Sequence, residues 1–148
     1  MTKEKILQML NHALELEYAA YAQYIRHAKL VSGANSAKII ERLDEIAGDE
    51  KKHQEKFQNL ILILGGIPTT KSAPIHSAKS ISEILETNRK DEKVAVDTYR
   101  KILDALRKEK GQGYYDHLLE HEVRHILMEE QEHITELELL LGNQGSSY

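Results

Sequence analysis

The sequence predicts an all-α protein, a bundle of four long helices. The 148-residue chain is rich in charged residues (30 %) and poor in aromatic ones (5 %), and it contains only two prolines, a composition typical of helical proteins. Turn-forming residues gather at a few points and leave four segments of about 30 residues. Within each segment, apolar residues recur at three- and four-residue spacing, the period of a helix with one buried face. A chain of this length is expected to form one domain, residues 1–148.

Each helix has identifiable ends. Glycine, serine and asparagine at 32–36 separate the first two helices, and a Gly-Gly pair ends the second. Ser80 and Glu83 have the spacing of a capping box at the start of the third, and Gly142 suits the position after the end of the fourth. Gly48 interrupts the second helix, where we expect a neighbouring helix to come close. The expected helices are 2–31, 37–64, 80–110 and 112–141.

The lengths of the connections predict how the helices are joined. A helix of 30 residues is about 45 Å long, which the short first and third connections cannot span. The first two helices therefore form one antiparallel hairpin and the last two form another. The middle connection has about 15 residues and reaches about 50 Å when extended. We expect it to be one long crossover along the bundle, between the second and third helices.

The composition also excludes several classes of function. The chain has no cysteine, so disulfides, thiolate catalysis and cysteine-ligated metal centres are excluded. Its net charge of −4 argues against nucleic-acid binding. The first residues lack the apolar core of a signal peptide, and no apolar run approaches the length of a membrane span. We therefore expect a soluble, cytoplasmic protein with no membrane partner.

Two Glu-x-x-His pairs indicate a metal site. Glu50 and His53 share one helix face because residues three apart are neighbours on a helix surface, and Glu130 and His133 repeat the spacing. One such pair is expected by chance in a chain with eight His and so many Glu. A third pair ends at His125. Two pairs at matched positions are much harder to attribute to chance.

The two pairs lie level with two further glutamates. Glu50 follows Gly33 by 17 residues and Glu17 precedes it by 16, so an antiparallel hairpin brings them to one height. The same kind of count places Glu92 and Glu130 at nearly the same height in the second hairpin. All four lie on apolar helix faces, where a carboxylate is costly unless a cation neutralises it. Nitrogen and oxygen ligands suit iron, manganese or zinc, so the sequence predicts a buried two-metal centre.

Two tyrosines follow the same repeat. Tyr24 lies seven residues after Glu17, and Tyr99 lies seven after Glu92. A buried hydroxyl needs a hydrogen-bond partner, and a ligand carboxylate one helix away would provide it. The alternative is that both are ordinary core tyrosines.

At these residues the chain resembles the ferritin-like superfamily of di-iron carboxylate proteins, most closely the bacterioferritin type. The resemblance covers about residues 3–141 and includes the crossover that begins Leu-Gly-Gly-Ile-Pro. It implies that Glu50 and Glu130 bridge two iron ions, that Glu17 with His53 completes one site and Glu92 with His133 the other, and that Tyr24 contributes to catalysis by a hydrogen bond to a ligand carboxylate. It further implies oxidation of Fe(II) by oxygen or peroxide, with ferric mineral stored in a hollow homo-oligomer.

The sequence departs from the family pattern at two points. Lys51 stands where haem-binding members have Met, so we expect no haem. Only seven residues follow Leu141, where members that form 24-mers have a fifth helix, so a dimer, a dodecamer and a 24-mer all stay open. Rubrerythrin-like peroxide reduction without mineral, and a purely structural metal-binding bundle, are the alternative functions.

Five of the six remaining histidines fall into two groups. His117, His121 and His125 are four residues apart on the fourth helix, which suits a second metal site or an iron path, or else a solvated polar stripe or an interface. His27 and His76 are expected on the surface.

Overall fold

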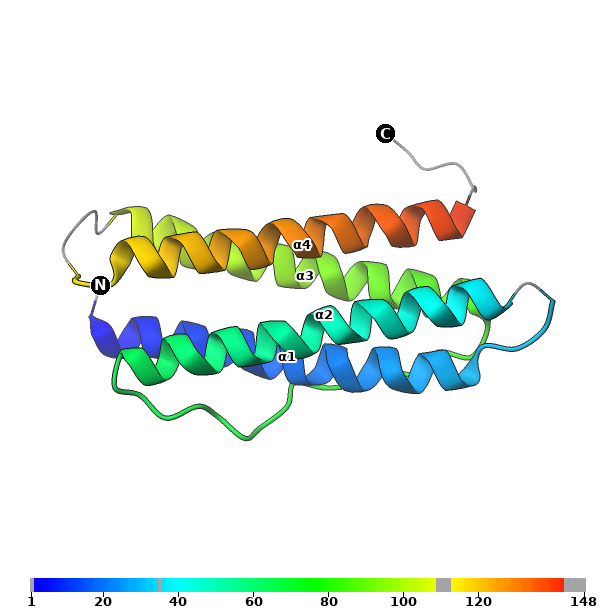
Figure 1. Cartoon of the computed structure of the whole chain (residues 1–148), viewed down its shortest axis with the longest axis horizontal. Coiled ribbons are helices and arrows are strands. Elements are labelled where there is room, and N and C mark those ends of the chain that lie inside the picture. Colours follow the sequence, from blue (N-terminus) through cyan, green and yellow to red (C-terminus); the bar gives the residue numbers. More distant parts are fainter. Residues whose placement is uncertain (1, 35, 109–112, 143–148) are drawn as a thin grey trace.

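The computed structural model describes residues 2–34, 36–108 and 113–142, and they form the four-helix bundle of Figure 1. The helices are α1 (Lys3–Leu30), α2 (Ser36–Ile63), α3 (Ile81–Lys108) and α4 (Asp116–Gly142). The all-α prediction is confirmed. Most helix ends agree with the predicted ones to within one or two residues. The expected end of the third helix at 110 and start of the fourth at 112 lie outside the described residues.

The helices pair as the connection lengths predicted. α1 packs along α2 and α3 packs along α4, and the two hairpins contact each other through α1 with α3 and through α2 with α4. In Figure 1, α1 and α4 run from left to right, and α2 and α3 run in the opposite direction. The crossover between α2 and α3 therefore travels the length of the bundle, which confirms the predicted connectivity.

The crossover is fastened along the side of α1. The Asn11 side chain donates to the Ile67 carbonyl (3.2 Å) and accepts from the Thr69 amide (2.8 Å). Further along, the Ala73 amide donates to the Glu15 carbonyl (3.0 Å). These bonds satisfy backbone groups in a segment that has no regular structure of its own. The crossover thus lies as a fixed strap over the α1 side of the bundle.

Local chemistry explains three of the helix ends. Ser80 and Glu83 form the predicted capping box, in which the Glu83 amide donates to Ser80 Oγ (3.1 Å) and the Ser80 amide donates to Glu83 Oε1 (3.3 Å). α2 ends at Ile63, and the turn that follows it contains Gly65, whose φ of +80° favours glycine. α4 begins later than expected because residues 113–115 form a turn, in which the Gly113 amide donates to Asp116 Oδ2 (2.9 Å).

The prediction for Gly48 was wrong. A Cβ atom built at Gly48 meets nothing within 4 Å, and the residue is exposed on α2. The close approach occurs instead at Gly66, just after α2, where a Cβ atom would lie 2.6 Å from Leu7 Cδ2. A larger residue at position 66 would therefore force the Leu7 side chain to move, whereas glycine at position 48 only weakens its helix.

The interior has an apolar cluster toward each end and a polar layer between them. One cluster includes Leu10, Phe57 and Ile126, and the other includes Leu43 and Leu137. Four glutamates and two histidines, each no more than 3 % exposed, lie in the layer that separates these clusters: Glu17, Glu50, His53, Glu92, Glu130 and His133. Among the described residues, no helix combines the length and apolar character that a membrane span requires.

Candidate metal centre

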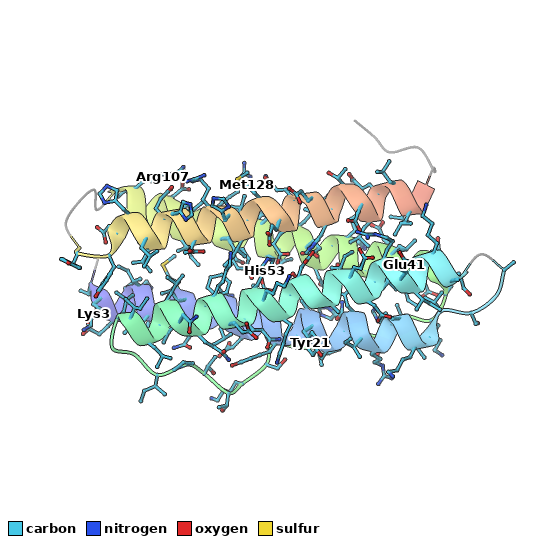
Figure 2. The ribbon with its side chains drawn as sticks, in the orientation of Figure 1. Lys3, Tyr21, Glu41, His53, Arg107 and Met128 are labelled. Carbon is cyan, nitrogen blue, oxygen red and sulfur yellow. The ribbon has the colours of Figure 1, made fainter. Side chains whose placement is uncertain are left out.

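Each helix contributes its part of the centre at mid-length. α1 supplies Glu17, α3 supplies Glu92, and α2 and α4 each supply a Glu-x-x-His pair. Figure 2 shows His53 in the interior, close to the middle of the bundle. The structure therefore brings together all six residues that the sequence singled out as metal ligands.

The six residues form two overlapping sets of four. In one set the ligand atoms of Glu17, Glu50, His53 and Glu130 all lie within 4.8 Å of one another, and in the other those of Glu50, Glu92, Glu130 and His133 do so. Glu50 and Glu130 belong to both sets, the arrangement expected of carboxylates shared by two ions. In both sets the histidine Nδ1 points inward. His53 Nδ1 lies 3.1 Å from Glu50 Oε1, and His133 Nδ1 lies 2.9 Å from Glu130 Oε1.

Several of these polar atoms lack a hydrogen-bond partner within the described structure: Glu17 Oε1, both carboxylate oxygens of Glu50, and His53 Nδ1. An unsatisfied buried polar atom is costly, and a carboxylate more so than a neutral group. Oxygen and imidazole donors without sulfur are a ligand set for iron, manganese or zinc. The residues present therefore fit two metal ions.

The tyrosine hydroxyls hold two of the carboxylates across the interface between the hairpins. Tyr24 of α1 donates to Glu92 Oε2 of α3 (2.8 Å), and Tyr99 of α3 donates to Glu17 Oε2 of α1 (2.6 Å). Burial, and then the Glu92 carboxylate, raises the pKa of Tyr24 well above 10. Burial, and then the Glu17 carboxylate, does the same for the pKa of Tyr99. Both hydroxyls therefore keep their protons and act as hydrogen-bond donors.

In the absence of a metal ion, the two shared carboxyls hold their protons to a higher pH than ordinary carboxyls do. Burial, together with the nearby Glu17 and Glu92 carboxylates, raises the pKa of Glu50 to about 8. Burial, with Glu17 and Glu50, raises the pKa of Glu130 well above its ordinary value. Several carboxylates at this distance cannot all be ionised unless positive charge enters the site.

The two imidazoles supply part of that positive charge. Burial lowers the pKa of His53, but Glu17 and Glu50 outweigh it and raise that pKa to about 12. For His133, Glu92 and Glu50 outweigh the effect of burial and raise the pKa to about 10. A metal ion bound through Nδ1 must displace these protons, so metal binding releases protons to solvent.

The outer nitrogens of both histidines contact carboxylates that the sequence analysis did not select. His53 Nε2 lies 2.6 Å from Glu129 Oε1 of α4, and His133 Nε2 lies 3.0 Å from Asp49 Oδ2 of α2. Both carboxylates are 46 % exposed. Such contacts orient the ring and leave Nδ1 for the metal. A signal for them exists in the sequence, because an acidic residue directly precedes each Glu-x-x-His pair.

A second buried polar group lies beside the centre. His27 is fully buried, which corrects the expectation that it lies on the surface. Its Nδ1 accepts from Asn88 Nδ2 (2.8 Å), and Asn88 Oδ1 accepts from Gln23 Nε2 (2.9 Å). The crossover covers this group, with the His76 amide donating to Gln23 Oε1 (2.7 Å). His76 itself is exposed, as expected. The helix period of the sequence does not show that the crossover covers His27, so it does not predict that this residue is buried.

A cavity of about 130 Å³ leads from the crossover to the centre. It lies between α1 and α3, and the crossover residues Ala73, Pro74 and His76 line one part of it. All four glutamates of the centre and both tyrosines line it as well. The cavity therefore joins the buried carboxylates to the face of the bundle that the crossover covers.

Comparison with known proteins identifies the family. A family model for the ferritin-like domain matches residues 7–144, nearly the whole chain. The chain is a ferritin-like protein of the bacterioferritin type. It is 29 % identical over 150 residues to the bacterioferritin of Desulfovibrio desulfuricans, with 99 % of this chain and 81 % of that protein covered. It is 31 % identical over 126 residues to the bacterioferritin of Brucella melitensis, with 82 % and 78 % covered.

Solved ferritin-like structures have the same bundle. A ferritin-like di-iron carboxylate protein from Bacillus anthracis strain Ames is 26 % identical, with a TM-score of 0.88 over 96 % of this chain and 100 % of that chain. A dodecameric thioferritin from Bacteroides fragilis is 25 % identical, with a TM-score of 0.84 over 97 % of this chain and 88 % of that chain. The fold and the family agree with the resemblance drawn from the sequence.

Proposed function

We propose that this protein is a ferroxidase, which binds two Fe(II) ions at the buried centre and oxidises them with oxygen or hydrogen peroxide. The observation that carries the proposal is the pair of overlapping ligand sets that share Glu50 and Glu130. In this proposal Glu17 and His53 complete one iron site, and Glu92 and His133 complete the other. Four carboxylates balance two divalent ions, so the metal removes the cost of burying the charges.

The reaction needs two electrons and two protons. Two Fe(II) ions supply the electrons, which reduce O₂ to H₂O₂, or H₂O₂ to two water molecules, with uptake of two protons in either case. Solvent supplies the two protons, because His53 and His133 lose theirs when metal binds. Tyr24 and Tyr99 hold Glu92 and Glu17 in place throughout, because their hydroxyls stay protonated.

We infer that Fe(II) or the oxidant reaches the centre through the cavity beneath the crossover. The cavity supports this role because the carboxylates of the centre form its inner end. Small side chains on the walls, including Ala20 and Ala95, leave the space open. A larger side chain there would obstruct the route without touching a ligand.

We propose a cytoplasmic homo-oligomer as the working form. Large apolar side chains support an interface, since Leu62 and Leu139 are each 59 % exposed. The Bacteroides fragilis relative is a dodecamer, and a closed shell of that kind is what mineral storage would require. Native mass spectrometry distinguishes a dimer, a dodecamer and a 24-mer directly.

We also propose that Lys51 excludes haem from the position that the family resemblance assigns to it. Lys51 is exposed on α2, with its ammonium 5.4 Å from the centre of the Tyr21 ring. An ammonium has no lone pair for iron, unlike a methionine thioether. Protein purified from cells supplied with haem is expected to show no Soret absorption, and a stoichiometric Soret band would contradict the proposal.

The experiment that tests the function is aerobic addition of Fe(II) to metal-free protein. Many tens of soluble ferric ions per chain would establish both oxidation and storage. A plateau near two would support oxidation at the centre and rule out storage, and peroxide consumption would then be measured with iron and with manganese.

Glu50→Ala should abolish oxidation above the protein-free rate, while Glu55→Ala, an exposed control on the same helix, should not. Equal rates for these variants would leave a structural metal site as the better explanation.

A further inference from the structure

A row of histidines on α4 lies outside the buried centre. His117, His121 and His125 are four residues apart, and all three are exposed. Met128, three residues after His125, is 45 % exposed and marks this outer side of α4 in Figure 2. The buried centre uses none of the three histidines, so their spacing has no explanation in the proposed ferroxidase reaction.

The structure distinguishes one pair within this row. The His121 and His125 ring centroids are 4.3 Å apart, closer than the 6.2 Å between the rings of His53 and His133. A carboxylate lies beside the pair, with Glu122 Oε1 3.9 Å from His121 Nδ1. The same carboxylate faces Lys56 Nζ through Oε2 at 3.5 Å. Two imidazoles on one helix face are therefore already close enough to share an ion.

The local sequence supports the same conclusion. Residues 121–125 read His-Glu-Val-Arg-His, the His-Glu-x-x-His order in which two imidazoles one helical turn apart bind zinc. Imidazole is a donor for Zn²⁺, Ni²⁺ and Cu²⁺. Within the described residues, groups of three or more such ligands converge only at the buried centre. The pair on α4 therefore lacks the third protein ligand of a catalytic zinc site, and water would complete the coordination.

We propose that His121 and His125 form a second metal site, which binds one exchangeable divalent ion of the zinc class on the exposed face of α4. The site is separate from the buried centre, but it is near it. Glu129 follows His125 by one helical turn, about 6 Å along the axis, and its carboxylate contacts His53. An ion at this surface site is thus held one helical turn from Glu129, one of the outer carboxylates of the centre.

The number of bound zinc ions tests the proposal. Metal-free full-length protein without a polyhistidine tag is dialysed against Zn²⁺ near pH 7.5, and bound zinc is counted per chain. His121→Gln and His125→Gln should each bind one zinc ion fewer than the natural sequence. His117→Gln is the matched control, because it removes an exposed histidine from the same row but not from the pair, and it should bind the full number.

Two results would overturn the proposal. If His125→Gln binds as many zinc ions as the natural sequence, the pair is no metal site. If His117→Gln loses an ion as readily as His125→Gln, the assignment to His121 and His125 is wrong. Because all three positions are exposed, unfolding temperatures of the metal-free variants should match, which excludes a folding defect as the cause of a lost ion.

Discussion

Glu50 lies fully buried at the middle of the centre, and neither of its carboxylate oxygens has a hydrogen-bond partner among the described residues. In the metal-free protein it is therefore a source of instability. The surrounding bundle tolerates it because apolar clusters on both sides stabilise the fold. A residue retained at the expense of stability is more readily explained by ligand binding than by packing.

The substitution Glu50→Gln should separate the effect of Glu50 on the stability of the metal-free protein from its effect on metal binding. We expect the metal-free variant to be more stable at pH 8 by about 1–4 kcal/mol, because a neutral amide of similar shape replaces a group that resists ionisation. The same variant should lose the stabilisation that Zn²⁺ or Fe(II) gives to the natural protein. Thermal unfolding with and without metal measures both effects, and Glu55→Gln is the exposed control. Lower stability without metal would show that Glu50 has a structural role instead.

The outer carboxylates, those of Glu129 and Asp49, should raise the metal affinity of the centre without binding metal themselves. Removing the partner of a ligating histidine typically lowers metal affinity about 10- to 100-fold. We expect Glu129→Gln to weaken the site of His53 and Asp49→Asn to weaken that of His133, while Glu132→Gln, exposed on α4, has no effect. Competition with a metal chelator measures the affinities. Unchanged affinity in both variants would contradict a positioning role.

Gly48 offers a test of helix propensity. Because a Cβ atom at this position meets nothing within 4 Å, Gly48→Ala should stabilise the protein by about 1 kcal/mol. For a chain of this size that corresponds to a rise of about 2–4 °C in Tm. Lys52→Ala, at an exposed position on the same helix, should change Tm much less. A lower Tm for Gly48→Ala would reveal a contact, such as a neighbouring subunit, against this face of α2.

At the scale of elements, the crossover does more than connect α2 to α3. It covers the polar group around His27 and lines the cavity that reaches the four glutamates. An ordinary short turn would leave this face of α1 and α3 uncovered. The long connection thus provides a wall for the route to the centre as well as a change of direction.

Narrowing the cavity should slow the reaction without removing a ligand. Ala20 lines the cavity, whereas Ala22 on the same helix does not. We expect Ala20→Leu to lower the initial rate of Fe(II) oxidation several-fold and to leave the final number of bound ions unchanged. Ala22→Leu is the matched control and should react at the natural rate. Stopped-flow absorbance makes the comparison, and equal rates in both variants would indicate a different access route.

At the scale of the whole molecule, the bundle consists of two similar halves that complete each other. α1 and α2 supply one glutamate, one tyrosine and one Glu-x-x-His pair, and α3 and α4 supply the same set. Each tyrosine and each outer carboxylate contacts a ligand from the opposite half. The centre therefore forms only when the two hairpins dock, so metal binding should stabilise the docked bundle.

The stability of the metal-free bundle should decrease as pH rises from about 5 to 9. The folded pKa of Glu50, about 8, lies above its ordinary value of 4.5, and that of Glu130 is raised in the same direction. The folded protein thus binds more protons than the unfolded chain over this range, which makes unfolding easier at higher pH. The raised pKa values of His53 and His133 act with the same sign above pH 6.5. Each group contributes a slope of about 1.4 kcal/mol per pH unit while only one state is protonated.

Metal should reverse this dependence. Since binding requires protons to leave the ligands, metal affinity increases with pH. Urea unfolding of metal-free and Zn²⁺-loaded protein at a series of pH values measures both trends. Stability of the metal-free protein that rises between pH 6 and 8 would contradict the raised pKa values on which the prediction rests.

The main features of the fold and the centre could be predicted because they depend on periodicity and length. Helix period places Glu17 and Glu50 on apolar faces, and the short first connection sets them at one height. The errors arose where a neighbour unknown from the sequence decides the outcome. His27 is buried by α3 and by the crossover, and the carboxylate of Glu129, which is not among the predicted ligands, reaches across to His53 on α2.

The sequence by itself determined the number of helices, their pairing into hairpins and the six residues that meet at mid-bundle, because all of these follow from local helix geometry and connection length. Only the tertiary structure decided which half supplies each outer partner and where the cavity runs. Those features depend on which helices are neighbours and how each is rotated about its axis. Contacts between distant parts of the chain set both, and no local pattern records them.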